Sequence, residues 1–292
     1  MTGPAPSDSG GRPRALGGFA RGLFVAVLAV FAGLPAGAAE GPQRVVSLNV
    51  CTDQLAMMLA APGQLVAVSA LARDPRASVM AEQAAAYPVT HGGAEEVFQL
   101  QPDLVLAGTY TTRHTTTMLR RLGVEVVEFA PTDSLQGIRE DISRMGRVLG
   151  REAAAEALLA EFDARLAALR DDPPHRPRAA LWSANGWSAG PRTLSGDILD
   201  AAGFDNVAAE AGLQWGGTLP LERLIMLDPD IVITGEPYPG HSRSEALLVH
   251  PALAALREAR AGAALSDAHW VCGTPHVLQA VARLRAAREA LP

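Results

Sequence analysis

Residues 151–170 read REAAAEALLAEFDARLAALR and contain neither Gly nor Pro. Ala, Leu, Glu and Arg dominate this stretch, and all four are strong helix formers. Its larger apolar side chains recur at spacings of three and four, which places them on one face of a helix: Leu158, Leu159, Phe162, Leu166 and Leu169. A 20-residue helix is about 30 Å long, the width of a small domain. The stretch therefore predicts one long helix.

This helix lies near the middle of the chain, between two regions of similar size. In both regions short apolar runs, such as residues 103–107, alternate with helical patterns, which is typical of a parallel sheet. We therefore expect an α/β fold with an N-terminal lobe at 43–131, a helical segment at 132–170 that contains the long helix as connector, and a C-terminal lobe at 178–292. The alternative is a single α/β domain in which the long helix is one more surface helix.

Composition sets broad limits on function. The chain has 292 residues, of which 48% are hydrophobic, and this is enough for a sizeable core in one or two domains. The formal net charge is −6, and the basic residues are scattered rather than gathered in a stripe. Nothing in this charge pattern supports nucleic-acid binding.

The N-terminus has the pattern of a targeting segment. Three Arg residues precede an apolar run at 23–34, which is too short to span a bilayer comfortably, and small residues follow at 36–38. This pattern predicts a cleaved signal peptide at 1–38 and export to a periplasm, where disulfides persist. No Cys lies near the cleavage site, which argues against a lipid anchor. The alternative is an uncleaved membrane anchor.

One pattern occurs twice with identical spacing. It consists of a Glu, a Pro-Asp pair that begins seven residues later, an apolar run and a Gly: Glu95, Pro102, Asp103 and Gly108 in the first copy, and Glu222, Pro229, Asp230 and Gly235 in the second. In each copy the Pro ends a helix and the Asp opens a buried strand. The repetition indicates two equivalent lobes, unless a common α/β turn has recurred by chance.

In open parallel sheets, ligands bind beyond the carboxyl ends of the strands. The loops expected there are 49–53, 70–74, 108–112, 183–190, 235–240 and 266–273. From these loops and their surroundings we take as candidate ligand-binding residues Cys51, Arg73, Tyr110, Trp182, Trp187, Trp215, Tyr238, Trp270 and Cys272. Aromatic side chains with polar tips suit a large, partly apolar ligand, and the alternative for each Trp is a place in the core.

The chain resembles the bacterial periplasmic substrate-binding proteins of the iron-chelate and vitamin B12 ABC importers. The resemblance is carried by Arg44-Val-Val-Ser-Leu48, by the paired Glu-x6-Pro-Asp strands and by the linking helix, and it covers nearly the whole mature chain. It implies two α/β lobes, joined by a single long helix, that clasp a ligand between them. It also implies a non-enzymatic protein that captures a metal chelate or corrinoid of the iron-siderophore, haem or cobalamin class.

The same resemblance implies delivery of the ligand to an inner-membrane ABC permease dimer with its ATPase. Carried onto this sequence, the residues that dock on the permease are Glu95 and Glu222, one in each lobe. Two equivalent carboxylates match a two-fold symmetric partner. A monomer without a cofactor of its own, and without contact to nucleic acid, is expected.

The two cysteines lie in different lobes, and three interpretations remain open for them. Cys51 and Cys272 form a disulfide across the cleft, ligate a soft metal or metal chelate as thiolates, or are ordinary small residues. The seven His residues form no compact ligand set, so no dedicated metal site is expected. Tyr110 raises the option of an axial haem ligand, for which a lone Tyr is weak evidence.

Two other classes of function compete with the binding protein. An exported α/β enzyme is one, but the sequence has no Gly-x-Ser-x-Gly, no Walker loop and no Gly-x-Gly-x-x-Gly. A sensory protein that uses the same cleft is the other. The ligand itself is left open, because the Trp residues suit a cobalamin, whereas Arg73, Arg113 and Arg192 are cations that suit an anionic ferric siderophore.

Overall fold

The computed structural model describes residues 1–3, 41–111, 113–236, 240 and 242–292, so Tyr238 and all but the first three residues of the expected signal peptide lie outside the described residues. The first lobe is built on five parallel strands in the order β3-β2-β1-β4-β5. In chain order these are β1 (Val45–Ser47), β2 (Leu65–Ser69), β3 (Val89–Thr90), β4 (Leu104–Gly108) and β5 (Glu125–Phe129). The helices of this lobe are α1 (Val50–Leu59), η1 (Ala70–Arg73), α2 (Ala81–Ala84), α3 (Ala94–Gln99) and α4 (Arg113–Arg121).

The second lobe contains four parallel strands in the order β11-β10-β6-β8. These are β6 (Arg178–Leu181), β8 (Asp205–Asn206), β10 (Ile231–Gly235) and β11 (Gly262–Leu265), and an antiparallel pair is added by β7 (Trp187–Ser188) and β9 (Gly217–Thr218). The helices are η2 (Ala184–Gly186), α7 (Leu194–Ala201), α8 (Leu221–Leu227), η3 (Arg243–Val249), α9 (Pro251–Ala259), η4 (Asp267–His269), η5 (Pro275–Val277) and α10 (Leu278–Glu289). The expected fold of two α/β lobes with mainly parallel sheets is confirmed.

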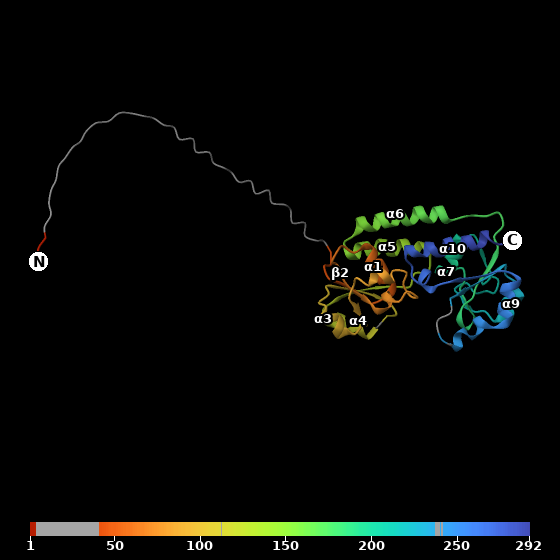
Figure 1. Cartoon of the computed structure of the whole chain (residues 1–292), viewed down its shortest axis with the longest axis horizontal. Coiled ribbons are helices and arrows are strands. Elements are labelled where there is room, and N and C mark those ends of the chain that lie inside the picture. The colour runs from red at the N-terminus through yellow and green to blue at the C-terminus, as the bar shows by residue number, and fades with distance from the viewer. Residues whose placement is uncertain (4–40, 112, 237–239, 241) are drawn as a thin grey trace, which may run out of the picture. The chain divides into compact units, whose positions relative to one another are not determined.

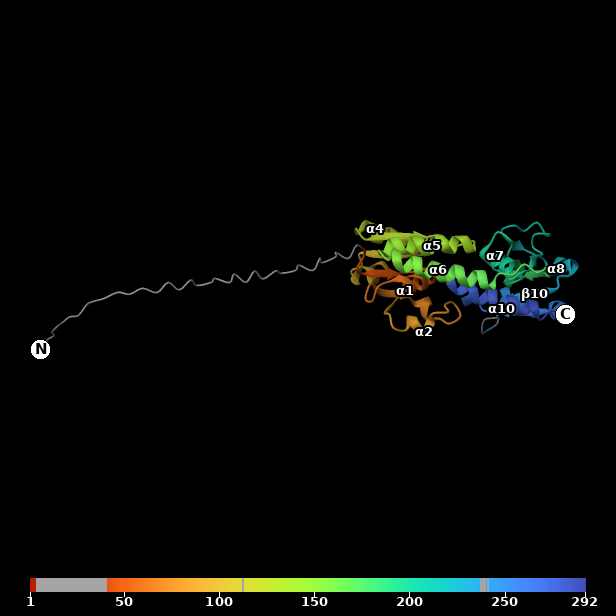
Figure 2. The same ribbon diagram turned by 90° about the horizontal axis from the view of Figure 1, so that it is seen from above.

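Two helices connect the sheets along the chain, α5 (Leu135–Leu149) and α6 (Glu152–Leu169). The helix expected at 151–170 is therefore present as α6. Phe162 and Leu166 are buried, and Leu158 is partly buried against the same core. In Figures 1 and 2, α6 runs beside α5 and α10, and it packs against both.

Each sheet is covered on both faces, which explains its continuous apolar strands. Successive side chains of a strand point to opposite faces, and the buried residues separate accordingly. In β4, Leu104 and Leu106 join a large hydrophobic cluster, whereas Val105 joins a smaller one within the first lobe. In β10, Ile231 and Ile233 join the same large cluster, whereas Val232 packs into a second small one. Both sheets thus turn one face towards a shared core.

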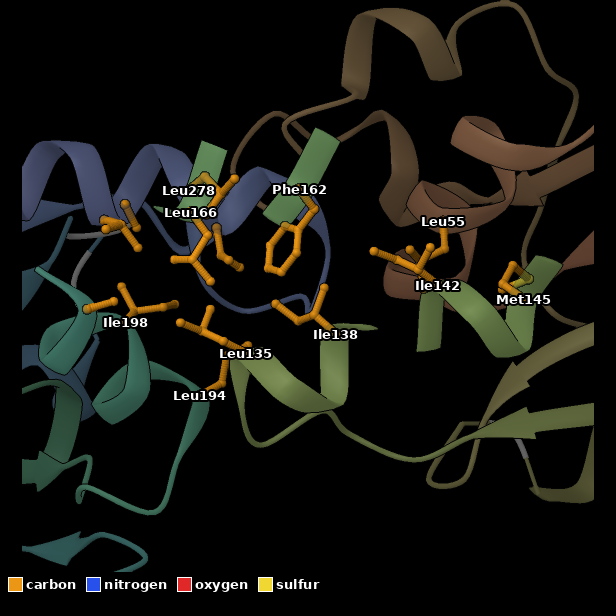
Figure 3. Packing of buried hydrophobic residues seen from close by; sticks show 14 of the residues in the cluster. Leu55, Leu135, Ile138, Ile142, Met145, Phe162, Leu166, Leu194, Ile198 and Leu278 are labelled. Carbon is orange, nitrogen blue, oxygen red and sulfur yellow. The ribbon is translucent and has the colours of Figure 1, made fainter. Parts of the chain in front are cut away.

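This shared core is a layer of helices rather than the contact surface of one connector. Figure 3 shows its side chains, which come from α1, α5, α6, α7 and α10 and include Leu55, Ile138, Ile142, Phe162, Leu166, Ile198 and Leu278. The resemblance to the importer proteins implied a single connecting helix. In the structure α6 is one member of a layer whose buried apolar side chains extend from α1 of the first lobe to α7 and α10 of the second. Bending at one connector would therefore disturb a packed interior.

The repeated Glu-x6-Pro-Asp pattern folds in the same way in both lobes. Gln101 and Asp228 have φ values of 49° and 46°, so each chain leaves its helix through the left-handed region and then enters the Pro. The Asp103 carboxylate accepts the backbone N–H of Arg44 at 2.9 Å, just before β1, and Asp230 accepts that of Arg178 at 2.7 Å, at the start of β6. In each copy, the Asp side chain thus connects the segment after the helix to the start of the neighbouring central strand.

Candidate ligand-binding site

A pocket lies at the carboxyl ends of β1, β4 and β5, where residues of the second lobe close its far side. Its cavity volume is about 120 Å³, and it opens to solvent. The lining residues are Asn49, Cys51, Thr52, Leu55, Gly108, Thr109, Tyr110, Thr111, Phe129, Ala130, Pro131, Thr132, Asp141, Val271 and Gly273. The strand order reverses between β1 and β4, and such a switch point is where open parallel sheets bind ligands.

Asn49 organises the floor of this pocket. Its side-chain oxygen caps α1 by accepting the N–H of Cys51 at 3.0 Å, and its amide nitrogen donates to the Thr111 hydroxyl at 3.0 Å. The loop after β1 is thereby joined to the loop after β4. Gly108 leaves room for this contact, because a Cβ atom there would lie 2.8 Å from the Thr111 Oγ1 and would displace it.

Cys51 and Cys272 form a disulfide, with Cα atoms 5.0 Å apart across 221 residues of sequence. Cys51 is the second residue of α1 in the first lobe and Cys272 follows η4 of the second, so the bond joins the two lobes at the pocket. Of the three interpretations that the sequence left open, the structure selects the disulfide. The thiolate interpretation is wrong, because neither cysteine has a free sulfur for a metal.

The backbone next to the disulfide also brings the lobes into direct contact. A Cβ atom at Gly273 would lie 2.3 Å from the Cβ of Thr132, so only glycine allows this approach. The Thr274 hydroxyl lies 3.4 Å from the side-chain oxygen of Gln54, and both residues are buried. The second lobe is therefore fixed to α1 and to the loop after β5 by contacts that surround the covalent bond.

Asp141 is the one charged residue in the lining of this pocket among the described residues. It comes from α5 and accepts a hydrogen bond of 2.6 Å from the Thr132 hydroxyl. Burial raises the pKa of the Asp141 carboxyl above its ordinary value, and the bond from Thr132 partly opposes this rise. The arrangement places one hydrogen-bond acceptor among neutral polar and apolar groups.

Asp53 lies behind the pocket on α1 and is fully buried. Its carboxylate accepts the N–H of Ser69 at 3.1 Å and the Ser69 hydroxyl at 2.5 Å. Burial raises the pKa of Asp53 from 3.8 to about 6, although these hydrogen bonds work in the opposite direction. The folded protein therefore keeps a proton on Asp53 in a pH range where the unfolded chain has already lost it.

This difference predicts how Asp53→Asn changes stability with pH. Below pH 3.8 both states of the wild-type protein hold the proton, so the neutral amide should leave the free energy of unfolding nearly unchanged. Between pH 3.8 and about 6 only the folded state holds it, so the wild-type protein loses stability as the pH rises. We expect the variant to gain up to about 3 kcal/mol relative to wild type by pH 7. Urea unfolding across this range measures the difference, and exposed Asp172→Asn is the control.

The gain of Asp53→Asn over wild type should rise with pH and then level off, and Asp172→Asn shows what the loss of one exposed carboxylate contributes by itself. A difference for Asp53→Asn that does not change between pH 4 and pH 7, about the range set by its shifted pKa, would contradict the buried ionisation.

The structure places several of the candidate aromatic residues at the surface. Tyr110 is 77% exposed and lines the pocket. Trp187 and Trp215, at 50% and 59% exposure, belong to the region of β7 and β9, and the Arg192 guanidinium lies 5.5 Å from the centre of the Trp215 ring. Trp215 and Arg192 line a second hollow together with Asp133, Ser134, Pro191 and Asp197. Trp270 is half-buried and packs against the shared core.

Two of the candidates occupy structural positions. Trp182 is 1% exposed, and its indole N–H donates to the Leu219 carbonyl at 2.9 Å, so its assignment to the ligand site is wrong. The apolar ring of Trp182 can fill the core of the second lobe because its one polar atom, the indole nitrogen, has a hydrogen-bond partner there. Arg73 donates to the backbone carbonyls of Ala84, Ala85 and Tyr87, and thereby holds the end of α2. It is absent from the pocket lining.

Residues 129–132, at the carboxyl end of β5, also line the pocket. They were not among the loops expected there, although the same rule of carboxyl ends applies to them. Asp141 is a different case, because it lies within a helix. Asp141 reaches the pocket only because α5 packs beside β5 and because the Thr132 hydroxyl donates a hydrogen bond to its carboxylate.

Glu95 and Glu222 lie outside the pocket, on α3 and α8, and both are exposed. Glu95 is 3.5 Å from the Gln99 amide within its own helix. Neither carboxylate belongs to an ion pair with another described residue. Both are available to a partner.

Within the described part of the chain, no group of three or more His, Cys, Asp or Glu residues is arranged to hold a metal ion. Over the same residues, no helix combines the length and the apolar character that crossing a bilayer requires.

Comparison with known proteins agrees with this architecture. Residues 45–262 match the model of a family described as "Periplasmic binding protein". A cobalamin-binding protein of Halobacterium salinarum is 36% identical over 200 residues, which are 66% of this chain and 54% of the relative, so the chain spans about half the length of that relative. A vitamin B12-binding protein of Yersinia pseudotuberculosis is 26% identical over 205 residues, covering 68% of this chain and 71% of the relative.

Among solved structures, the periplasmic haem-binding protein RhuT of Roseiflexus sp. RS-1 superimposes with a TM-score of 0.69 and 26% identity, over 85% of this chain and 98% of the other. These relatives are binding proteins. Three quarters of the chain match the family model, in agreement with the two parallel sheets and the pocket at their carboxyl ends. The chain therefore belongs to the periplasmic binding protein family.

Proposed function

We propose that this chain is an exported solute-binding protein that captures a corrinoid of the cobalamin class in the pocket between its lobes. The observation that carries the choice of ligand is the charge of the lining. The described residues around the pocket include one carboxylate and no Lys or Arg. A corrinoid with its neutral amide side chains suits such a surface, whereas an anionic ferric siderophore requires cations to balance its charge.

The contacts available in the pocket match amide groups. Asn49 and Thr111 form a neutral polar edge, and Asp141 offers a carboxylate to an N–H donor. Phe129 and Pro131 supply apolar contact. The names of the curated relatives, a cobalamin-binding protein and a vitamin B12-binding protein, support the same class of ligand.

The three Arg residues that would suit an anionic ferric siderophore do not line this pocket. Arg73 holds backbone carbonyls and Arg192 lies over Trp215, while Arg113 begins α4 and does not line the pocket. Their placement weakens the case for an anionic chelate in this pocket. The proposal also includes cleavage of the signal peptide, a periplasmic location, and delivery to an ABC permease dimer through Glu95 and Glu222. It assigns the chain no catalytic turnover.

Haem is the second candidate, because one observation favours it. The Tyr110 phenol is 77% exposed at the pocket, where it can reach an iron atom as an axial ligand. Haem carries two carboxylates, however, and the described lining offers no cation to them. For this reason haem ranks below a corrinoid.

Isothermal titration calorimetry of the mature protein tests the assignment, with cobalamin, haem and a ferric hydroxamate siderophore as the titrants. We expect saturable binding of one cobalamin per protein and weaker binding of the other two. Tyr110→Ala should weaken cobalamin binding about tenfold, because it removes a large aromatic contact at the rim. Leu122→Ala, an exposed apolar change away from the pocket lining, is the control.

Tight haem binding, with an absorption spectrum that Tyr110→Phe alters and with no response to cobalamin, would establish the second candidate instead. Hydrolysis or chemical change of the titrant would point to the exported enzyme that the sequence left open.

A further inference from the structure

The pocket between the lobes is small for the ligand proposed above. Its cavity of about 120 Å³ is the volume of roughly four water molecules at about 30 Å³ each. Sites that enclose a whole drug-sized ligand have about 300–1,000 Å³, and a corrinoid is larger than such a ligand. The enclosed space therefore matches one side chain of a corrinoid, which ends in a primary amide, rather than the whole molecule.

The walls of this pocket are held together from both lobes. The disulfide between Cys51 and Cys272 joins the lobes at the lining. Thr132, in the loop after β5, lies so close to Gly273 of the second lobe that a Cβ atom at Gly273 would be 2.3 Å from that of Thr132. The pocket is thus fixed before a ligand arrives, and the corrin ring must stay at its mouth, where Tyr110 is 77% exposed.

One carboxylate oxygen in the lining is available to a ligand. The Asp141 Oδ2 accepts the Thr132 hydroxyl at 2.6 Å, whereas its Oδ1 accepts no hydrogen bond from any described residue. Arg144 attracts the charge of Asp141, but its guanidinium lies over the Phe129 ring, 4.3 Å from the ring centre. The same guanidinium donates to the Glu128 carbonyl at 2.9 Å and does not line the pocket. Asp141 therefore offers an acceptor that no ion pair with a described residue occupies.

The donor that an amide also needs is available from Thr111. Its Oγ1 accepts the side-chain N–H of Asn49 at 3.0 Å, so its own hydrogen can be donated to a ligand. A hydroxyl donor and a carboxylate acceptor in one lining are the partners that the C=O and the N–H groups of a primary amide require. Leu55 and Phe129 add apolar contact for the methylene groups of such an arm.

We propose that this pocket binds one propionamide arm of the corrinoid, with Asp141 accepting from its N–H and Thr111 donating to its C=O. The propionamide arms are the longer ones, so they extend furthest from the ring past the mouth. This assignment rests on the proposed function and deepens it, because it names the group that enters the pocket and the residue that selects it. A propionate arm of nearly the same shape would place a second negative charge beside Asp141, and such a like-charge contact is strongly unfavourable.

Cyanocobalamin and its isomeric monocarboxylic acids test this assignment, since each acid has one propionamide arm hydrolysed to a propionate. The whole mature protein is titrated with each of them by calorimetry at about pH 8, far above the ordinary carboxyl pKa, so that both carboxyls are ionised. We expect one isomer to bind at least about tenfold more weakly than cyanocobalamin. The other isomers should bind within about threefold of it, because their charged arms stay outside the pocket.

Asp141→Asn should remove most of this discrimination, because an amide side chain can donate to a propionate as well as accept from a propionamide. The variant should bind the disfavoured isomer within about threefold of cyanocobalamin. The matched control is Glu140→Gln, the same chemical change at the next residue of α5, where the side chain is exposed and outside the lining. It should keep the wild-type discrimination. Circular dichroism verifies that both variants are folded.

Equal affinity of the wild-type protein for cyanocobalamin and all of the acids would overturn the amide pocket without any variant. Discrimination that stays at the wild-type level in Asp141→Asn would also overturn it, because another residue would then select the arm. In both cases the binding of cyanocobalamin would leave the proposed function standing. Absence of cyanocobalamin binding would instead overturn the proposed function, and the amide pocket with it.

Discussion

Replacing both cysteines, Cys51→Ser with Cys272→Ser, should lower the free energy of unfolding by about 2–5 kcal/mol. The bond closes a loop across 221 residues and joins the lobes at the pocket, so its loss frees the unfolded chain and removes a constraint on the folded one. For a protein of this size the loss corresponds to a fall in melting temperature of roughly 5–20 °C. Chemical unfolding in urea and thermal unfolding followed by circular dichroism measure both quantities.

The chain offers a strict control for this experiment. It contains two cysteines in total, so no other disulfide can replace the missing one. Wild-type protein treated with a thiol reductant should lose stability by a similar amount, and the double variant should not respond to the reductant at all. A wild-type protein whose unfolding is indifferent to complete reduction would show that the bond contributes nothing to stability.

Phe162→Ala in α6 should lower the free energy of unfolding by about 3–5 kcal/mol, as expected for truncating a buried aromatic side chain. Phe162 is 1% exposed and packs in the shared core among α5, α6 and α10, with the Arg139 guanidinium 5.4 Å from its ring centre. The cavity would lie where the buried residues of both lobes meet. Urea unfolding, followed by fluorescence and by circular dichroism together, measures the change.

The neighbouring Glu161→Ala is the control for helix propensity and surface charge. Its carboxylate is exposed and forms a single ion pair within the turn at 3.5 Å, so the change should stay within about 0.5 kcal/mol. Because both sheets bury one face in the same core, we expect Phe162→Ala to lower one common transition. Two separate transitions, of which the variant moves only one, would show that the lobes unfold independently and that the core is not shared.

Local patterns were sufficient to predict the elements that depend on them. The helix at 151–170 was visible because its residue types and spacing determine a helix with one apolar face, and it appears as α6. The two Pro-Asp units were visible because a Glu, a Pro-Asp pair, an apolar run and a Gly recur with the same spacing in both copies. The alternation of strands and helices then gave the class of fold.

The sequence predicted less well the places where residues far apart along the chain come into contact in the fold. The sequence placed Trp182 at the end of a strand but could not show that Leu219 would satisfy its indole N–H inside the core. It placed Asp141 on a helix but could not show that Thr132 would draw it to the pocket. The bond between Cys51 and Cys272 is the extreme case, because it depends on the separation of two loops that only the packing of the complete helical layer determines.

The disulfide also changes what proteolysis can do to this protein. From residue 51 to residue 272 the chain is a closed covalent ring that contains nearly all strands of both sheets. One cut in any surface loop of that ring opens it without releasing a fragment, and both walls of the binding pocket stay attached to each other. Release of a fragment requires a second cut within the ring, or one cut together with reduction of the disulfide.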